Sequence, residues 1–491
     1  MIPVALWRPQ VLVAGGGPSG ICAAIAAARN GARTLLIERY GFLGGTVTSA
    51  SVGPFAPFHH GDEQVIRGIP QEIIERLEAL GGASGHLKIV PSFGSGTYMC
   101  WVDREIYKYA ALELVQEAGA DILLHTWVSE VVMEGNRIRG VMVQNKSGRQ
   151  MIPADIVVDA TGDGDIIAAS GAGFYIGRDS DGRTQPMTLL FEMAGVDVPT
   201  VRHYIETHPD EFEWWSRAVP VRPLRPEFQQ DHFIAQGYLS LVREAMAKGE
   251  LNLGRESVLF LTTLRPGTIT FNSTRVIGKR GNDARELTEA EIEGRRQAMS
   301  LAGFMKKHAP GFSRAYMVTS GVQIGVRESR RLKGEYLLTT EDVKHGQKFP
   351  DVIARGYFPI DIHHLAGKEG YKQDGSTWVE LDDSYDIPYR CCVPEQVEGL
   401  LVAGRCISAS HEALGSTRST GSCMALGQAT GTAAALAVRD NVLPRKVDVR
   451  ELQALLEEQG ASLHRPAGQV PGGPTVPFPR STTGPTAKET V

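Results

Sequence analysis

The chain is poor in cysteine, in basic clusters and in long apolar runs, and each absence excludes a class of function. Six cysteines are spread over 491 residues and none forms a C-x-x-C pair, so iron–sulfur and zinc sites lack a ligand set and we expect no metal. A net charge of −5 without a basic block argues against binding to nucleic acid or to an anionic membrane surface. No apolar run approaches the roughly 20 residues that cross a bilayer.

Cysteine usage and the first residues predict a cytoplasmic protein. Scattered thiols in a large chain are typical of a reducing compartment. The first ten residues hold two prolines and one arginine instead of an apolar stretch, unlike a signal peptide. The adjacent Cys391 and Cys392 are interpreted as two unrelated thiols, because neighbouring residues of a strand point to opposite faces.

The length and composition predict an enzyme-like globular protein of more than one domain. A chain of 491 residues is too long for a single core, and 42% hydrophobic with 22% charged residues is ordinary for a globular chain. Residues 463–491 are rich in proline, glycine, threonine and serine without an apolar period, so we expect this tail to be disordered.

A glycine-rich turn near the N-terminus is the most informative motif. Val11 to Ala14 predict a buried strand, and Gly15-Gly16-Gly17-Pro18-Ser19-Gly20 follow directly. In the pattern G-x-G-x-x-G, Gly15 permits a tight turn, Gly17 lets a pyrophosphate approach the backbone, and Gly20 lets the helix pack closely on the strand. The N-terminus of that helix attracts anions.

The residues after this turn complete the start of a βαβ unit. Thr34 to Ile37 predict a second strand, and Glu38 stands at its end, where a ribose-binding acid is expected. A glycine motif alone is weak evidence, because an ordinary strand-to-helix corner can look the same. The complete order of strand, helix, strand and acid favours nucleotide binding.

Two later strands also end in glycine. Ala154 to Asp159 lead into Ala160-Thr161-Gly162-Asp163-Gly164-Asp165, and Leu400 to Ala403 lead into Gly404-Arg405. Glycines directly after a strand mark backbone that approaches a ligand, although a turn with capping aspartates is the alternative. Between them, residues 121–144 alternate as strands with the hairpin turn Gly135-Asn136, which predicts an antiparallel meander.

These blocks resemble the FAD-dependent oxidoreductases of the glutathione-reductase-like flavoprotein superfamily, in a family related to the flavin subunit of heterodisulfide reductase. The resemblance rests on the first glycine motif with Glu38, on Gly41-Phe42-Leu43-Gly44-Gly45, on Ala160-Thr161-Gly162 and on the segment from Leu400. It implies that FAD is the cofactor. The FAD contacts that it implies are Gly15, Gly17, Pro18, Ser19, Gly20, Glu38, Arg39, Gly44, Gly45, Thr46, Val128, Thr161, Gly162, Asp163, Gly404, Gly421 and Ser422.

The expected fold is α/β, with a Rossmann-like FAD-binding domain that carries a β-meander and an inserted α+β substrate domain. We predict the FAD domain from residues 1–176 and 387–445, and the insert from 177–386, where the βαβ pattern disappears. Within the insert, Pro199 to Lys248 predict short helices and loops. Ligands of two-domain enzymes lie where the domains meet, so the insert should complete the active site.

Two charged segments of the insert supply candidate catalytic residues. One contains Arg327, Glu328 and Arg331, and the other contains Asp361 and His363. Spacing alone favours a solvated, salt-bridged hairpin. The resemblance implies instead that an arginine and His363 face the flavin, and it adds the block from His411 to Arg418. The candidate catalytic residues are therefore His363, Arg327, Arg331, His411 and Arg418.

The predicted function is hydride exchange between the flavin and a small substrate, with arginines binding an anionic group and a histidine or arginine handling the proton. An electron-transferring flavin subunit of a larger complex is one alternative, which the missing cysteine clusters disfavour. A monooxygenase that uses NAD(P)H is another, although a second complete glycine motif is missing. Homo-oligomer formation is left open.

Overall fold

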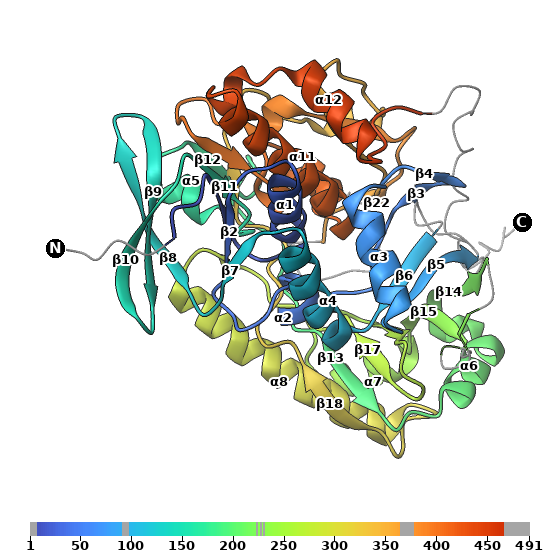
Figure 1. The fold of residues 1–491 in the computed structure, drawn as a ribbon. Coiled ribbons are helices and arrows are strands. Elements are labelled where there is room, and N and C mark those ends of the chain that lie inside the picture. Colours follow the sequence, from blue (N-terminus) through green and yellow to red (C-terminus); the bar gives the residue numbers. More distant parts are fainter. Residues whose placement is uncertain are drawn as a thin grey trace, which may run out of the picture.

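The structure is a computed structural model that describes residues 7–90, 98–221, 224–225, 228, 231–363 and 378–465. Its centre is a five-stranded parallel sheet in the order β24-β11-β1-β2-β7 (Figure 1). The five strands are β1 Val11–Ala14, β2 Thr34–Ile37, β7 Asp121–Leu123, β11 Ile156–Asp159 and β24 Leu400–Val402. This arrangement confirms the predicted Rossmann-like fold. The predicted disordered tail lies outside the described residues from 466 onwards.

Two helices from opposite ends of the chain pack directly against each other, α1 (Pro18–Arg29) and α11 (Thr420–Arg439), seen in dark blue and red in Figure 1. Glycines make this contact close. A Cβ on Gly427 would lie 2.0 Å from the carbonyl oxygen of Ser19, and one on Gly431 would lie 2.2 Å from that of Ala23. The C-terminal segment is therefore an integral part of the N-terminal nucleotide-binding unit.

The predicted meander is confirmed in part, as a three-stranded antiparallel sheet in the order β10-β9-β8, whereas its expected first strand begins with Asp121–Leu123, which form β7 of the parallel sheet. Its strands are β8 Trp127–Glu134, β9 Arg137–Asn145 and β10 Gly148–Pro153. Val141 and Ile152 share one buried core with Val157 and Leu400 of the parallel sheet. The meander thus covers one face of the parallel sheet, which is why it brings Val128 to the edge where a nucleotide would bind.

A second body is built on an eight-stranded antiparallel sheet in the order β18-β13-β17-β16-β15-β14-β5-β6. The long helix α8 (Ala284–His308) packs on it through Ala298, Leu301 and Met305, which share a core with Phe191 and Phe271. The strands are β5 Ala83–Val90, β6 Tyr98–Val102, β13 Phe191–Ala194, β14 Phe212–Pro220, β15 His232–Gly237, β16 Val258–Thr262, β17 Ile269–Phe271 and β18 Tyr316–Ser320.

The predicted domain boundaries do not follow these sheets. Strands β5 and β6, at residues 83–102, complete the eight-stranded sheet instead of adding to the parallel sheet: β5 pairs with β14, and β6 pairs with β5. Conversely, much of 330–386 packs with the nucleotide-binding body: β19 (Arg330–Leu332) pairs with β12 (Phe174–Ile176), and Leu338, Val352 and Ile387 share a core with α11. Pairing between distant segments, which local patterns do not encode, sets these boundaries.

The segment predicted as short helices and loops contains two strands, β14 and β15, between α6 (Val198–Thr207) and α7 (Leu239–Ala247). Along β14, Phe212, Trp214, Ser216 and Ala218 are the buried residues. Small and polar residues on the buried face hid the alternation that predicts a strand.

The remaining elements are shorter, apart from α3 and α4, which flank the nucleotide-binding body. They are α2 Thr46–Ser49, α3 Ile69–Ala79, α4 Arg104–Glu117, α5 Asp165–Ala169, α9 Thr340–Lys344, α10 His411–Thr417, α12 Val449–Glu458, β3 His59–His60, β4 Glu63–Gln64, β20 Val352–Gly356, β21 Ile360–Asp361, β22 Trp378–Val379 and β23 Tyr385–Pro388. None of the helices in the described part of the chain has the length and apolarity of a membrane span.

The contact between α1 and α11 can be tested with two glycine substitutions. We expect Gly427→Ala to lower the free energy of unfolding by ~1–3 kcal/mol, because the added methyl group forces two backbones apart. Gly303 is the matched control: it lies in α8 with no atom within 4 Å of an added Cβ. Gly303→Ala should raise the free energy of unfolding by ~1 kcal/mol through helix propensity. Urea denaturation checks both, and equal stability of Gly427→Ala and the native chain would contradict the contact.

Candidate active site

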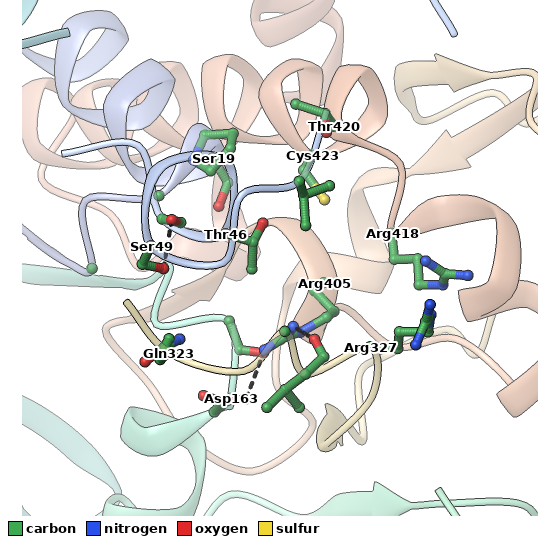
Figure 2. Close-up of a pocket in the computed structure, with 18 of the residues that line it drawn as sticks. Ser19, Thr46, Ser49, Asp163, Gln323, Arg327, Arg405, Arg418, Thr420 and Cys423 are labelled. Atoms are coloured by element: carbon green, nitrogen blue, oxygen red, sulfur yellow. Dashed lines mark hydrogen bonds and ion pairs between the residues drawn. The ribbon is translucent and has the colours of Figure 1, made fainter. Parts of the chain in front are cut away.

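A cavity of about 320 Å³ lies at the carboxyl ends of the parallel strands, where the segment between β18 and β19 meets the nucleotide-binding body (Figure 2). Gly15 and Gly17 line it after β1, Glu38 after β2, Thr161 after β11 and Arg405 after β24. A smaller cavity of about 60 Å³ continues from it, since both are lined by Gly15, Glu38, Arg39 and Thr161, and reaches Val128. This edge of a parallel sheet is where α/β proteins bind nucleotides.

The glycine loop after β1 presents bare backbone to the cavity. Gly15 has a φ of 102°, and a Cβ there would lie 2.5 Å from the carbonyl oxygen of Ala160. A Cβ on Gly45 would lie 2.7 Å from the Cα of Gly17. Gly17 is the N-cap of α1, and no side chain caps this helix. The first N–H groups of α1 are therefore available to an anion, which is the geometry that a pyrophosphate requires.

Glu38 links the glycine loop to the second strand. Its Oε2 accepts a hydrogen bond from the Gly16 N–H at 2.7 Å, and its Oε1 accepts one from the Tyr40 N–H at 2.9 Å. The carboxylate retains further lone pairs and lines both cavities. Glu38 can therefore orient the loop and still accept hydrogen bonds from ribose hydroxyls. The neighbouring Arg39 donates to Gln323 at 2.8 Å, which brings the segment after β18 to the same place.

The loop after β11 is held by hydrogen bonds to two side chains, those of Asp159 and Arg405. Asp159 accepts hydrogen bonds from the N–H and Oγ of Thr161 at 3.0 and 2.7 Å and from the Ile167 N–H at 3.0 Å. Burial raises the pKa of Asp159 to about 6. Arg405 donates to the carbonyl of Gly162 and to the carboxylate of Asp163, both at 2.6 Å, and also to the carbonyl of Val326.

At the far side of the cavity from the glycine loop, two guanidinium groups point toward each other, those of Arg327 and Arg418 (Figure 2). Arg327 donates through Nη1 to the carbonyl of Pro186 at 2.6 Å and to Oγ1 of Thr188 at 2.7 Å. Arg418 donates through Nη2 to the carbonyl and the carboxylate of Asp361 at 3.0 and 3.1 Å.

One histidine joins this cluster: Nε2 of His363 lies 3.3 Å from the Asp361 carboxylate, and both residues line the cavity. Burial, reinforced by Arg327, lowers the pKa of His363 to about 4. Burial, followed by the charge of Arg418, lowers the pKa of Arg327 to about 9. Burial works to raise the pKa of Asp361, but the hydrogen bond from His363 and the charges of Arg418 and Arg327 outweigh it and hold that pKa below its usual range. At neutral pH the cluster holds two cations, one anion and a neutral imidazole.

Two predicted catalytic residues, Arg331 and His411, do not line the cavity. Arg331 is only 1% exposed and donates to the carbonyls of Ala409 and Gly177 at 2.7 and 2.5 Å. His411 is 4% exposed, and its Nδ1 lies 2.9 Å from the Glu328 carboxylate. The polar partners of both side chains, Ala409, Gly177 and Glu328, are not among the residues that line the cavity.

Several predicted FAD contacts do not line either cavity, namely Gly20, Gly44, Gly404, Gly421 and Ser422. Their small size serves packing: a Cβ on Gly20 would lie 1.8 Å from the carbonyl oxygen of Gly15, and one on Gly404 would lie 2.6 Å from Oγ of Ser19. The other predicted FAD contacts, and the candidates Arg327, His363 and Arg418, do line a cavity.

Sequence reasoning missed lining residues from both bodies. Among them are Thr188, Asn272, Gln323, Arg405, Thr420 and Cys423. Arg405 follows a strand-terminal glycine, and that position was a usable signal. Thr188, Asn272 and Gln323 come from the eight-stranded sheet and its connections, where no motif marks them.

The comparison with protein families decides the identity of the chain. The sequence profile of the family described as FAD dependent oxidoreductase matches residues 10–456. The chain belongs to this family. The oxidoreductase therefore uses FAD, and the exposed N–H groups at Gly17 together with the Glu38 carboxylate fit a dinucleotide. The wider relationship to glutathione reductase and heterodisulfide reductase stays a prediction.

Individual relatives of the oxidoreductase match only part of it. The thiamine thiazole synthase of Aeropyrum pernix is 34% identical over 167 residues, which are 32% of this chain and 55% of that protein. The digeranylgeranylglycerophospholipid reductase of Methanoculleus marisnigri is 28% identical over 166 residues, 33% of this chain and 38% of that protein. The chain thus spans about half or less of the curated relatives it matches. A geranylgeranyl bacteriochlorophyll reductase-like protein from Thermoplasma acidophilum superposes with a TM-score of 0.45 at 16% identity, covering 92% of this chain and 84% of that one.

The role of Glu38 can be tested through FAD affinity. We expect Glu38→Ala to weaken FAD binding by about 1.5–3 kcal/mol, or roughly 10- to 150-fold, because it removes charge-assisted hydrogen bonds to the ribose and to the glycine loop. Glu72→Ala, which removes an exposed ion pair with Arg29, is the control and should leave FAD binding unchanged. Fluorescence titration of the apoprotein with FAD measures both, and an unchanged affinity of Glu38→Ala would contradict this assignment.

Proposed function

We propose that the oxidoreductase exchanges a hydride between FAD and a small organic acid whose carboxylate binds between Arg327 and Arg418. The observation that carries this proposal is the pair of guanidinium groups that face each other across one side of the cavity. Two like charges at close range in a buried site favour an anion between them.

The unused donors of the two arginines suit a carboxylate. Nη1 of Arg327 donates to Pro186 and Thr188. Nε and Nη2 of this side chain donate to no residue in the described part of the chain. These two N–H groups form one edge of the guanidinium and can bind both oxygens of a carboxylate. Nε of Arg418 is likewise buried without a partner among the described residues. A single carboxylate can therefore receive hydrogen bonds from both side chains.

The charge of the cluster favours a neutral reacting group on the substrate. Arg327 and Arg418 outnumber Asp361 by one positive charge, and Arg255 and Arg275 lower the pKa of Arg327 further. A hydroxy acid brings one negative charge and neutralises the cluster. An amino acid brings a zwitterion with an additional ammonium group, which the same arginines repel. We therefore propose an alcohol group on the reacting carbon.

Each reacting group of such a substrate can be matched to a residue of the site. FAD supplies the two-electron redox chemistry when bound. In alcohol oxidation the C–H bond breaks with loss of a hydride, the O–H proton goes to His363, and a ketone is formed. Asp361 stabilises the resulting imidazolium through the contact at Nε2. Because Arg327 contributes to the low pKa of free His363, a carboxylate bound to Arg327 raises that pKa toward neutrality and makes His363 a better base.

The roles of Arg327 and His363 are separable by mutation. We expect Arg327→Ala to weaken binding of the acid about tenfold or more, and Arg327→Lys to restore little, because lysine lacks the two-pronged edge. His363→Ala should slow flavin reduction about 100-fold or more with FAD still bound. Anaerobic stopped-flow measurement of flavin bleaching checks this, using whichever of lactate, mandelate and related hydroxy acids bleaches the native protein.

Normal binding and normal rates in both alanine variants would contradict the proposal. Oxygen consumption measured with and without NADPH separates it from the monooxygenase alternative. A monooxygenase consumes oxygen only when NADPH is present, whereas in the proposed reaction the acid alone reduces the flavin and any oxygen consumed reoxidises it without NADPH.

The substrate class can be tested with matched pairs of acids. We expect lactate to perturb the flavin spectrum with a Kd at least about tenfold lower than that of alanine, and mandelate to do so relative to phenylglycine, because one desolvated charge repulsion exceeds 1.4 kcal/mol. The preference should shrink in Arg418→Gln. Equal or tighter binding of the amino acids would contradict the proposed neutral reacting group.

A further inference from the structure

The two arginines that face the cavity come from different elements of the chain. Arg327 lies in the segment before β19, and Arg418 is the C-cap residue of α10. No described hydrogen bond joins the two side chains, so something else must fix their separation. A substrate that bridges them requires that separation to be correct within a fraction of an ångström.

A buried hydrogen bond joins these two elements behind the cavity. Glu328 directly follows Arg327, and its Oε1 lies 2.9 Å from Nδ1 of His411, the first residue of α10. The side chains are almost fully inaccessible, Glu328 at 1% and His411 at 4% exposed. The bond therefore connects the base of the Arg327 segment to the beginning of the helix that ends at Arg418.

The second oxygen of Glu328 fixes the support of Arg327. Oε2 accepts a hydrogen bond from the Gln185 N–H at 3.0 Å, and the carbonyl of the next residue, Pro186, accepts from Arg327 at 2.6 Å. Glu328 and Arg327 thus hold the same short stretch of backbone from two sides. A displaced Glu328 carboxylate would move the carbonyl that orients the Arg327 guanidinium.

Arg331 completes the buried group. Its Nε lies 3.5 Å from Glu328, and its Nη1 donates to the carbonyl of Ala409, two residues before His411. Burial of a carboxylate with a guanidinium and an imidazole contributes little net stability compared with apolar packing of the same volume. The three buried polar side chains are therefore better explained by fixing the positions of neighbouring residues than by stabilising the fold.

We infer that Glu328 and His411 are positioning residues that set the separation of Arg327 and Arg418 and thereby the affinity for the substrate carboxylate. This inference rests on the proposed function of the two arginines. Neither Glu328 nor His411 touches the cavity, so both act through the arginines and not on the substrate.

Two substitutions at position 411 separate this role from simple packing. His411→Asn keeps an N–H donor close to the position of Nδ1, whereas His411→Leu keeps the bulk and removes the donor. We expect His411→Leu to raise the Kd for lactate and mandelate about tenfold or more at unchanged FAD content, and His411→Asn to retain most of the native affinity. Glu328→Gln, which turns one carboxylate oxygen into a donor that faces another donor, should behave like His411→Leu.

The control breaks an ion pair far from the cavity. Glu117→Gln removes the exposed contact with Arg76 and should leave the Kd for both acids and for FAD unchanged. Equal Kd values for the native protein, His411→Leu and Glu328→Gln would overturn the positioning role while leaving the carboxylate site intact. The carboxylate site is shown to be intact in that outcome if Arg327→Ala loses acid binding while His411→Leu and Glu328→Gln retain it.

Crystal structures of the FAD-bound native protein and of His411→Leu test the geometry without any substrate. A change of about 1 Å or more in the distance between the Arg327 and Arg418 guanidinium groups supports the inference. Superimposable arginines would overturn it, whatever the acids do. If the native protein binds neither acid but the arginines still move in His411→Leu, the positioning role stands and the proposed substrate class fails.

Discussion

The contact between α1 and α11 is the constraint on which the site depends. Because Gly427 and Gly431 let the two backbones meet at Ser19 and Ala23, both helices begin beside the same cavity: Ser19 lines it from α1, and Thr420 from α11. Two positive helix ends are thereby directed at one region. Segments that are about 400 residues apart in the sequence must therefore be assembled before the wall of the cavity is complete.

The polar groups around the cavity are held mainly by backbone carbonyls and buried carboxylates. Arg405 binds the carbonyls of Gly162 and Val326 and so joins the loop after β11 to the segment that carries Arg327. Arg405 and Arg418 each pair with a carboxylate, whereas Arg327 donates to a carbonyl and a hydroxyl and has a lowered pKa because of its burial and the neighbouring arginines. Such preorganised positive charge favours bound anions, since little side-chain entropy is lost on binding.

The sequence predicted those features that depend on local patterns. The glycine motif, Glu38 and Thr161 mark the edge of the parallel sheet at which the larger cavity lies, because a short apolar strand followed by glycine has few alternatives. It did not distinguish Arg327 from Arg331, since an irregular segment has no period that tells which side chain faces the cavity. Neither did it place β5 and β6, because sheet partners more than a hundred residues away are not encoded locally. The catalytic candidates thus came from the resemblance to a flavoprotein family, and the tertiary fold was needed to show which of them line the cavity.

The recruitment of β5 and β6 into the eight-stranded sheet has a mechanical consequence. The chain passes from the nucleotide-binding body to this sheet and back before it enters the sheet again at β13, so the two bodies are tethered at several separated points. Tethers spread over an interface resist rotation about a single hinge. A fragment that lacks residues 177–386 would retain β5 and β6 with the apolar surface of Leu87 and Ile89 uncovered, because β14 and several of the side chains that pack against this surface lie within those residues.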